Sequence, residues 1–329
     1  MKSFESICRL TQKNLKKYLK TELGNLGYQN VISEDGFLFA PGEFPVLLCA
    51  HMDTVHEHVP TKIISTKGRG GCTILSAAEG IGGDDRCGIY MVLQIAAQKK
   101  CSVLFLEDEE IGLVGASKFT YSPVSAGLNF NYIMEFDRAN DKDAVFYECC
   151  NDEFVEFIEK SGFYKEAFGS CSDISEIAPC LGVAAVNLSC GYYRQHTKSE
   201  YVIVEEMEAS IKAAIQILND TKPEDKFEYV EMVRFGRTYG DSFSLYDEDV
   251  YADYLIGASM ERGDAELEYL FYLYDENTDA EYEDQVSGRS LAEAVGSILM
   301  QHPDITFNNI LDWECISGSS HHEALKMIR

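Results

Sequence analysis

The stretch Cys49-Ala50-His51-Met52-Asp53-Thr54-Val55 joins an apolar run, residues 44–50, to a polar loop. We expect the apolar run to be a buried strand. Side chains alternate between the faces of a strand, so His51 and Asp53 would lie on one face. A carboxylate beside an imidazole fixes its tautomer and raises its basicity, as metal sites require. The alternative is an ordinary strand-end histidine followed by a helix-capping aspartate. The residues at the other predicted strand ends distinguish these two interpretations.

The size and charge of the chain limit its class. It has 329 residues, enough for one large α/β domain and a smaller second one. Its formal charge of −27 argues against nucleic acid or an anionic membrane as a partner. Residues 221–329 hold 24 acidic residues against 8 Lys and Arg, a net charge of −16. We therefore expect a domain of residues 1–220, a linker near residues 222–226, and an acidic C-terminal domain, 221–329, of unknown role.

The cysteines and the N-terminal segment indicate a compartment. Eleven cysteines, an odd number, are scattered without the spacing of a disulfide framework. Residues 1–23 read as a Lys-rich amphipathic helix and not as a signal peptide, and no apolar run reaches membrane-spanning length. We expect a protein of the reducing cytoplasm with free thiols.

Short apolar strands alternate with helical segments through the first 220 residues. We expect strands at 31–39, 44–50, 61–66, 73–78, 101–106, 132–136, 144–149 and 182–188, and helices at 86–98, from 111 onward, at 152–160 and at 205–218. This alternation predicts an α/β fold, a mixed, mostly parallel twisted sheet with helices on both faces. In the C-terminal region, 250–274 and 291–300 read as helices, so we expect that small acidic region to be mainly helical.

Acidic or imidazole side chains follow several of the predicted strands. They are His51 with Asp53, Asp84 with Asp85, Glu109 with Glu110, Asp137, and His196. In an open α/β sheet, ligands bind at the carboxyl ends of the strands. Each side chain alone could be a helix cap or a surface charge, but carboxylates crowded at one edge repel unless cations hold them. Two histidines with several carboxylates and no cysteine cluster suit zinc, with cobalt or manganese as alternatives.

Five motifs around these residues resemble the metal-site motifs of the zinc-dependent exopeptidase superfamily. That superfamily includes di-zinc aminopeptidases, peptidase-T-like tripeptidases, and related carboxypeptidases and deacylases. The motifs follow the family's order over about residues 40–215. They are His51-Met52-Asp53-Thr54-Val55, Gly83-Asp84-Asp85-Arg86-Cys87-Gly88, Asp108-Glu109-Glu110-Ile111-Gly112, Glu135-Phe136-Asp137 and His196-Thr197-Lys198-Ser199-Glu200-Tyr201.

The resemblance implies a site for two divalent metal ions. The implied ligands are His51 and Asp137 for one ion, Glu110 and His196 for the other, and Asp84 for both. Two such ions, about 3.5 Å apart, would lower the pKa of a bridging water and polarise a scissile carbonyl.

The resemblance also implies roles for the neighbours of the ligands. Asp53 would orient His51, and Glu109 would be the general base and acid that moves the water proton to the leaving amine. Adjacent residues of an extended chain point in different directions, so Glu109 can face the water while the next residue binds metal. The family further implies a cis peptide between Asp84 and Asp85, a conformation that costs about 3 kcal/mol and persists where function fixes it.

The spacing of the motifs departs from many relatives. Only 59 residues separate Asp137 from His196, and 33 separate His51 from Asp84. Both intervals are too short for the lid or dimerisation domain that many members insert there. The core thus resembles the compact aminopeptidase branch, although the motifs of His51 and Glu109 are more similar to peptidase T. Residues 221–329 resemble nothing we can name and would cap the site, form a homo-oligomer or bind a protein partner.

Two further residues are candidates for the substrate cleft. Asp173 lies where relatives place a segment that lines the cleft; the alternative is a helix N-cap before Ile174. Arg194 precedes His196 and would contact substrate, unless it belongs to a packed strand end. We do not expect His56 or His58 to bind metal, because the set of five ligands is complete without them.

We expect a di-zinc aminopeptidase that acts on short peptides. A carboxypeptidase or an N-acyl amino acid deacylase with the same site is the first alternative. It would need a basic residue for the substrate carboxylate, and Arg86, Arg138 and Arg194 leave that open. A non-catalytic binding protein with a peptidase fold is the second alternative, but such a protein would be expected to have lost a ligand or the base.

Overall fold

The structure is a computed structural model that describes residues 2–147, 152–169, 171–222, 224–230, 267–275, 280–288, 297–298, 301–302 and 310–315. The chain divides into two compact units, Met1–Phe235 (unit 1) and Gly236–Arg329 (unit 2). Unit 1 contains the helices α1 (Phe4–Cys8), α2 (Gln12–Asn25), α3 (Gly83–Ala96), α4 (Val114–Tyr121), α5 (Asp152–Glu159), α6 (Asp173–Leu181) and α7 (Val204–Asp220), with a short 3-10 turn at Arg69–Gly71.

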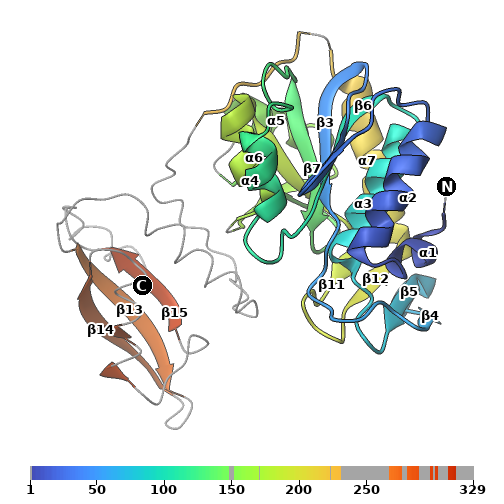
Figure 1. Ribbon diagram of the computed structural model, residues 1–329. Coiled ribbons are helices and arrows are strands. Elements are labelled where there is room, and N and C mark those ends of the chain that lie inside the picture. The colour runs from blue at the N-terminus through green and yellow to red at the C-terminus, as the bar shows by residue number, and fades with distance from the viewer. Residues whose placement is uncertain are drawn as a thin grey trace. The chain divides into compact units, whose positions relative to one another are not determined.

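An eight-stranded mixed sheet forms the centre of unit 1 (Figure 1). Its order is β1 (Ile32–Glu34), β2 (Phe37–Ala40), β6 (Cys101–Leu106), β3 (Phe44–His51), β7 (Tyr132–Arg138), β10 (Ala185–Ser189), β8 (Asp143–Val145) and β9 (Lys165–Ala167). The four central strands, β6, β3, β7 and β10, run parallel. The pairs β1/β2, β2/β6 and β10/β8 are antiparallel, and the edge pair β8/β9 is parallel. The predicted α/β fold with a mixed, mostly parallel core is confirmed.

Strand β3 is buried on both faces because the sheet lies between two apolar cores. Val46, Leu48 and Ala50 face the core that also contains side chains of α1, α2, α3, α5 and α7. Leu47 and Cys49 face the core formed with α4 and α6. Figure 1 shows α3 and α7 on one side of the sheet and α4 and α6 on the other. This two-sided burial explains why β3 reads as a continuous apolar run.

Strand β3 lies between β6 and β7 in the sheet. The segment that contains α3 connects β3 to β6, and the segment that contains α4 connects β6 to β7, on the other side of β3. Because α3 and α4 cover opposite faces, the carboxyl ends of β3, β6 and β7 open onto a crevice of the kind that binds ligands in α/β folds.

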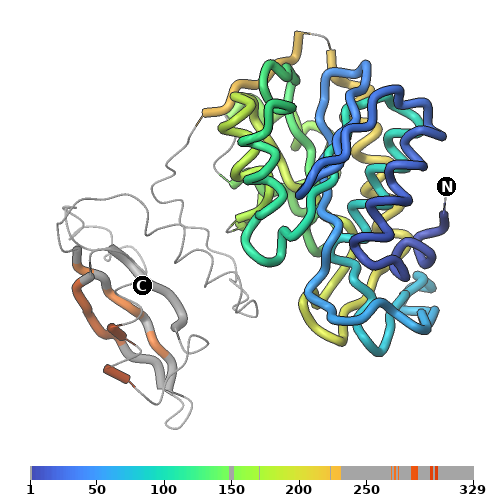
Figure 2. Tube along the Cα trace, in the orientation of Figure 1, coloured from blue at the N-terminus to red at the C-terminus, as the bar shows by residue number. Residues whose placement is uncertain are grey.

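A second, four-stranded antiparallel sheet completes unit 1. It joins β11 (Tyr192–Tyr193), β12 (Tyr201–Ile203), β5 (Thr73–Ala77) and β4 (Ile63–Lys67) in that order. Figure 2 shows the segments of β5 and β12, which are distant in the sequence, side by side at the lower end of unit 1. The pairing of β12 with β5 brings the loop that carries His196 to the segment that precedes α3.

The prediction of a mainly helical C-terminal region was wrong for most of its described residues. They form an antiparallel sheet of β14 (Ala280–Gly288), β13 (Leu267–Asp275) and β15 (Ile310–Cys315). Residues 250–266 of one expected helix lie outside the described residues; within the other, Ser297 and Ile298 are helical. Phe271 and Leu273 are both fully buried at a spacing of two residues, the period of a strand. Aromatic residues, which favour strands, outweigh the helical spacing here.

Two boundaries differ from expectation in unit 1. The first helix is divided, because Thr11 caps α2 by accepting a hydrogen bond from the backbone N–H of Asn14. The predicted linker contacts the domain: the Lys222 carbonyl accepts a hydrogen bond from Asn131 Nδ2, and Lys226 Nζ donates to Asn129 Oδ1. Phe227, the next residue, packs on Tyr132 and Phe154. No helix among the described residues is long and apolar enough to cross a membrane.

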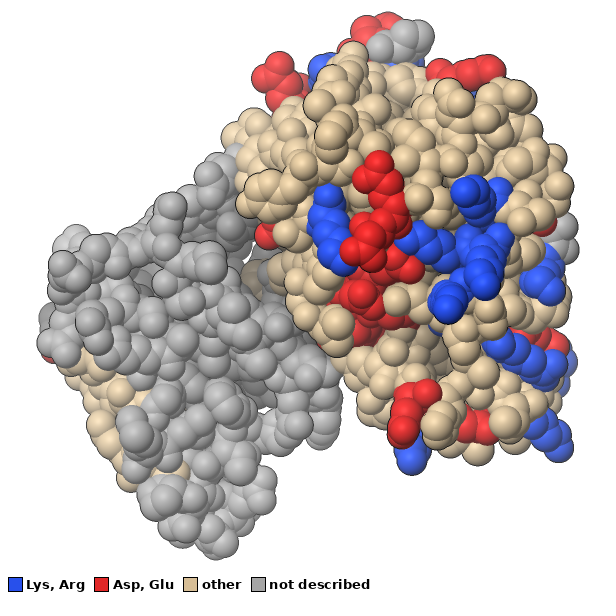
Figure 3. Space-filling view, viewed as in Figure 1, with Lys and Arg blue, Asp and Glu red and all other residues tan. Residues whose placement is uncertain are grey.

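Charged side chains are unevenly spread on the surface of unit 1. Figure 3 shows a group of acidic side chains on one face, beside a group of Lys and Arg. Two ion pairs of described residues join opposite charges, Lys16 with Glu107 at 2.5 Å and Lys118 with Asp35 at 2.7 Å. Opposite charges therefore lie side by side on the surface of this unit.

Candidate metal centre

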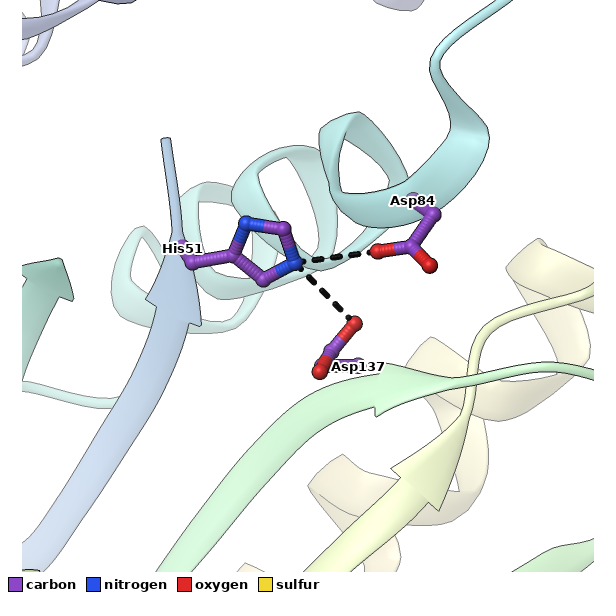
Figure 4. A group of neighbouring side chains, drawn as sticks. All are labelled: His51, Asp84 and Asp137. Carbon is purple, nitrogen blue, oxygen red and sulfur yellow. Dashed lines mark hydrogen bonds and ion pairs between the residues drawn. The ribbon is translucent and has the colours of Figure 1, made fainter. Parts of the chain in front are cut away.

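Three of the predicted ligands converge from β3, α3 and β7 (Figure 4). The Nε2 atom of His51 lies 2.9 Å from Oδ1 of Asp84 and 3.3 Å from Oδ1 of Asp137. All three side chains are at least nine-tenths buried. Each comes from the end of a different strand or from the start of a helix, so the folding of the chain brings the three side chains together.

Asp84 also contacts the second predicted histidine. Its Oδ2 atom lies 3.2 Å from Nε2 of His196, and the same Nε2 lies 3.1 Å from Oε2 of Glu110. One carboxylate thus has one oxygen beside each imidazole. His196 lies in the loop between β11 and β12 in a left-handed conformation, φ +59°, and its side chain is 30% exposed.

Asp53 connects the His51 side to the loop after β6. Its Oδ1 lies 3.1 Å from Nδ1 of His51 and accepts a hydrogen bond from the backbone N–H of Glu109 at 3.0 Å. Its Oδ2 accepts from the N–H of Glu110 at 3.1 Å. The Asp53 carboxylate therefore leaves Nε2 of His51 for the crevice and holds both glutamates in place.

The donor set fits two divalent cations. Ligand atoms of His51, Asp84 and Asp137 lie within 4.8 Å of one another, and so do those of Asp84, Glu110 and His196. Oε1 of Glu110 is buried and has no hydrogen-bond partner among the described residues. Imidazole and carboxylate donors without thiolates suit zinc, cobalt or manganese. The assignment of these five residues as ligands stays a prediction that this geometry supports.

The pKa values show how strongly the carboxylates are crowded. Burial, together with the negative charge of Asp84, raises the pKa of Asp137 to about 7. Burial also raises the pKa of Glu109 well above its ordinary value, with Asp137 contributing. For Asp84 the effect of burial is outweighed by hydrogen bonds with His196 and His51, which lower its pKa. Divalent cations would relieve this repulsion.

The carboxylates around the two imidazoles raise the pKa of both rings. Burial lowers the pKa of His196, but hydrogen bonds with Asp84 and Glu110 outweigh it and raise the value to about 12. The pKa of His51 is raised well above its ordinary value for the same reason, with Asp137 the largest favourable contributor. We therefore expect a metal ion bound by His196 to displace its proton.

Comparisons with known proteins identify the fold. No protein-family model matches the chain, and no curated protein matches it in sequence. The aminopeptidase PepT from Bacillus cereus has a similar structure, with a TM-score of 0.52 and 15% identity over 65% of this chain and 96% of that chain. A tripeptidase from Staphylococcus aureus has a TM-score of 0.51 and 13% identity, over 65% and 95%. The chain shares the fold of these two peptidases.

The exopeptidase fold predicted from the five motifs is thereby confirmed. A cis peptide joins Asp84 to Asp85, as the resemblance implied. His56 is not among the grouped ligand atoms, and its Nε2 lies 2.9 Å from Oε2 of Glu200.

The two cleft candidates have different surroundings. Asp173 is not the N-cap of α6, because Ser172 fills that position with a capping box to Ser175. The Asp173 side chain is 1% exposed, both its oxygens have no hydrogen-bond partner among the described residues, and burial raises its pKa to about 8. Such a side chain does not line an open cleft by itself. Arg194, in contrast, is exposed in the loop before His196.

The sequence did not reveal the roles of three buried side chains that hold ligand segments. Asp85 accepts hydrogen bonds from the backbone N–H of His51 and of Gly88. Asn187 accepts from the N–H of Asp137 and donates to its carbonyl. Asn187 could have been noticed in the sequence, because it is a polar residue within the apolar run of β10.

The third missed residue, Glu200, lies four positions after His196. Its side chain is fully buried and accepts hydrogen bonds from the backbone N–H groups of Gly82 and Asp84. Nothing in the sequence indicates contacts between segments more than a hundred residues apart.

Proposed function

We propose that this protein is a di-metal aminopeptidase that hydrolyses short peptides, with zinc as the expected metal. The position of Asp84 carries the proposal. One of its oxygens lies beside His51 and the other beside His196, and each imidazole also contacts a different second carboxylate. Two ions held there would share Asp84.

The chain's own residues supply the binding and the proton transfer. When bound, the metal pair supplies Lewis-acid polarisation of a carbonyl and lowers the pKa of water. Glu109 belongs to a group of possible ligand atoms with His51 and Glu110, yet it is not in either set that includes Asp84. We assign it as the general base that takes the water proton and returns it to the leaving amine.

The raised pKa of Glu109 supports that assignment. Burial raises the pKa of the Glu109 carboxyl, which is the direction that a general acid requires. Hydrogen bonds from the backbone N–H groups of Glu109 and Glu110 to Asp53 fix the backbone beneath both side chains. The general base and the ligand Glu110 are therefore positioned by one carboxylate.

Two of the three arginines near the motifs are engaged elsewhere, which favours an aminopeptidase. Arg86 is buried and donates to the carbonyl oxygens of Met52, Asp53 and Leu10. Arg138 is paired with Asp143 at 3.4 Å. A carboxypeptidase or deacylase needs a basic group for the substrate carboxylate, whereas an acidic site favours a substrate ammonium.

Exposed Arg194 supports the second candidate, a carboxypeptidase or N-acyl amino acid deacylase. It lies two positions before His196, where it could bind a substrate carboxylate. Under this candidate, replacement of Arg194 by alanine would raise KM for N-acetylated substrates. Under the aminopeptidase proposal the same change has little effect on the hydrolysis of free peptides.

A substrate panel tests the proposal. The zinc-loaded protein is assayed with free dipeptides and tripeptides and with their N-acetylated counterparts, and release of the amino acid is measured. We expect hydrolysis of the free peptides, and little of the acetylated ones because acetylation removes the ammonium. Preference for acetylated peptides would instead favour the second candidate. Zinc binding without hydrolysis of any substrate would favour a non-catalytic binding protein.

A further inference from the structure

Glu200 joins the loop of one predicted ligand to the backbone of another. Its Oε1 accepts a hydrogen bond from the N–H of Asp84 at 3.0 Å, and its Oε2 accepts one from the N–H of Gly82 at 2.8 Å. Oε2 also lies 2.9 Å from Nε2 of His56. The Glu200 side chain is fully buried, so water does not compete for these contacts.

The segment 196–200 therefore holds Asp84 at two points. His196 contacts the carboxylate of Asp84 through Nε2 at 3.2 Å, and Glu200 binds its backbone N–H. The antiparallel pairing of β12 with β5 fixes this segment in the fold, since β12 begins directly after Glu200. One end of the segment meets the side chain that two metal ions would share, and the other end fixes its backbone.

The glycines before α3 permit the approach. A Cβ atom on Gly83 would lie 3.3 Å from Oε1 of Glu200 and 2.8 Å from Cβ of Tyr192. A Cβ atom on Gly80 would lie within 2.5 Å of the ring atoms of His56. Gly82 has φ +66°, in the left-handed region that favours glycine. The glycine-rich sequence Gly80-Ile81-Gly82-Gly83 thus lets Glu200 and His56 pack against the backbone beside Asp84.

We propose that Glu200, supported by His56, is a positioning residue that sets the direction of the Asp84 carboxylate toward both metal sites. The inference rests on the proposed function, because it concerns the ligand that the two ions would share. A carboxylate suits this position because it only accepts hydrogen bonds, and three donors point at it: two backbone N–H groups and His56 Nε2. A glutamine would turn its NH₂ group toward one of these donors and leave that donor unsatisfied.

The test compares zinc binding by Glu200→Gln with that of the wild-type protein and of Glu208→Gln, an exposed glutamate on α7. Affinity and stoichiometry are measured by competition with a chromophoric chelator, after circular dichroism has shown that the variant is folded. We expect Glu200→Gln to weaken zinc binding by about 10- to 100-fold, the usual cost of losing an outer partner of a ligand. Because Asp84 is shared, both ions should be affected, and kcat should fall more than KM rises.

His56→Ala provides a second variant in case Glu200→Gln does not fold. It removes one of the three donors and leaves both backbone bonds, so we expect a smaller loss of affinity in the same direction. Zinc affinity equal to that of the wild type in the folded Glu200→Gln protein, or in His56→Ala when only that variant folds, would overturn the proposal. If the wild type binds zinc but hydrolyses no peptide, the proposed function fails while the affinity comparison still decides the role of Glu200.

Discussion

The two sides of the metal centre are built differently. His51 ends a central strand of the sheet, is 1% exposed, and is held through Nδ1 by Asp53 and through its backbone N–H by Asp85. His196 lies in a loop between two short strands, and its side chain is 30% exposed. The sheet thus fixes one side as part of the core, while the other side depends on a loop. Asp84 is the carboxylate that contacts both.

This difference predicts a larger loss of stability on the His51 side. In the metal-free protein, His51→Ala would leave buried carboxylates, among them Asp84 and Asp137, without their cationic partner. Breaking a buried pair in this way costs about 3–5 kcal/mol. His196→Ala removes a ring that is 30% exposed, so water can reach the carboxylates of Asp84 and Glu110 that it leaves, and we expect a smaller loss of stability.

Urea unfolding of both variants in the presence of a chelator measures these free energies. The exposed His58, which lies outside the grouped ligand atoms, provides a matched control as His58→Ala. Equal losses of unfolding free energy for His51→Ala and His196→Ala would show that the two sides are equally part of the core, contrary to the comparison.

A smaller effect concerns the protons that zinc displaces. Hydrogen bonds with Asp84 and Glu110 raise the folded pKa of His196 to about 12, so we expect this ring to be protonated at pH 7, and the neighbouring carboxylates also raise the pKa of His51. Their contribution to the stability of the metal-free protein is present below the ordinary histidine pKa of about 6.5 and is lost as pH rises through the folded value.

Zinc binding must release these protons, so the affinity for zinc should fall as pH falls, by about tenfold per pH unit for each proton released. Titration calorimetry in two buffers of different protonation enthalpy counts the protons. We expect His196→Ala to release about one proton fewer than the wild type. An unchanged proton count would mean that His196 is not displaced from a protonated state.

The candidate metal ligands could be predicted from the sequence better than the residues that hold them in position. His51, Glu110 and Asp137 each follow an apolar run, so strand ends and motif order were enough to place them together. Asp85 and Glu200 act through contacts with backbone N–H groups that lie 34 and 116 residues away, and only the folded chain shows these contacts. The sequence also does not show how deeply Asp173 is buried. Its pattern fits a helix cap or a cleft residue, but Ser172 is the N-cap and the Asp173 carboxylate is buried.

The fold was predictable where periodicity and composition agree. Strand β3 is apolar on both faces and could be identified as a central strand. Residues 267–274 mix Tyr, Leu and Glu so that helical spacing and strand alternation both fit, and the burial of Phe271 and Leu273 shows that alternation prevails. The pairing of β13 with β14 in a hairpin, and with β15 further along the chain, stabilises the strand, and local sequence does not show the second pairing.

The most direct test of a di-metal hydrolase with Glu109 as its base is the Glu109→Gln variant, with Glu208→Gln as the matched control. Zinc content and hydrolysis of a free dipeptide are measured on the same preparations. We predict that Glu109→Gln retains the zinc content of the wild type and loses hydrolysis, because glutamine cannot take up the water proton. Hydrolysis at the wild-type rate by the zinc-loaded Glu109→Gln protein would contradict the account.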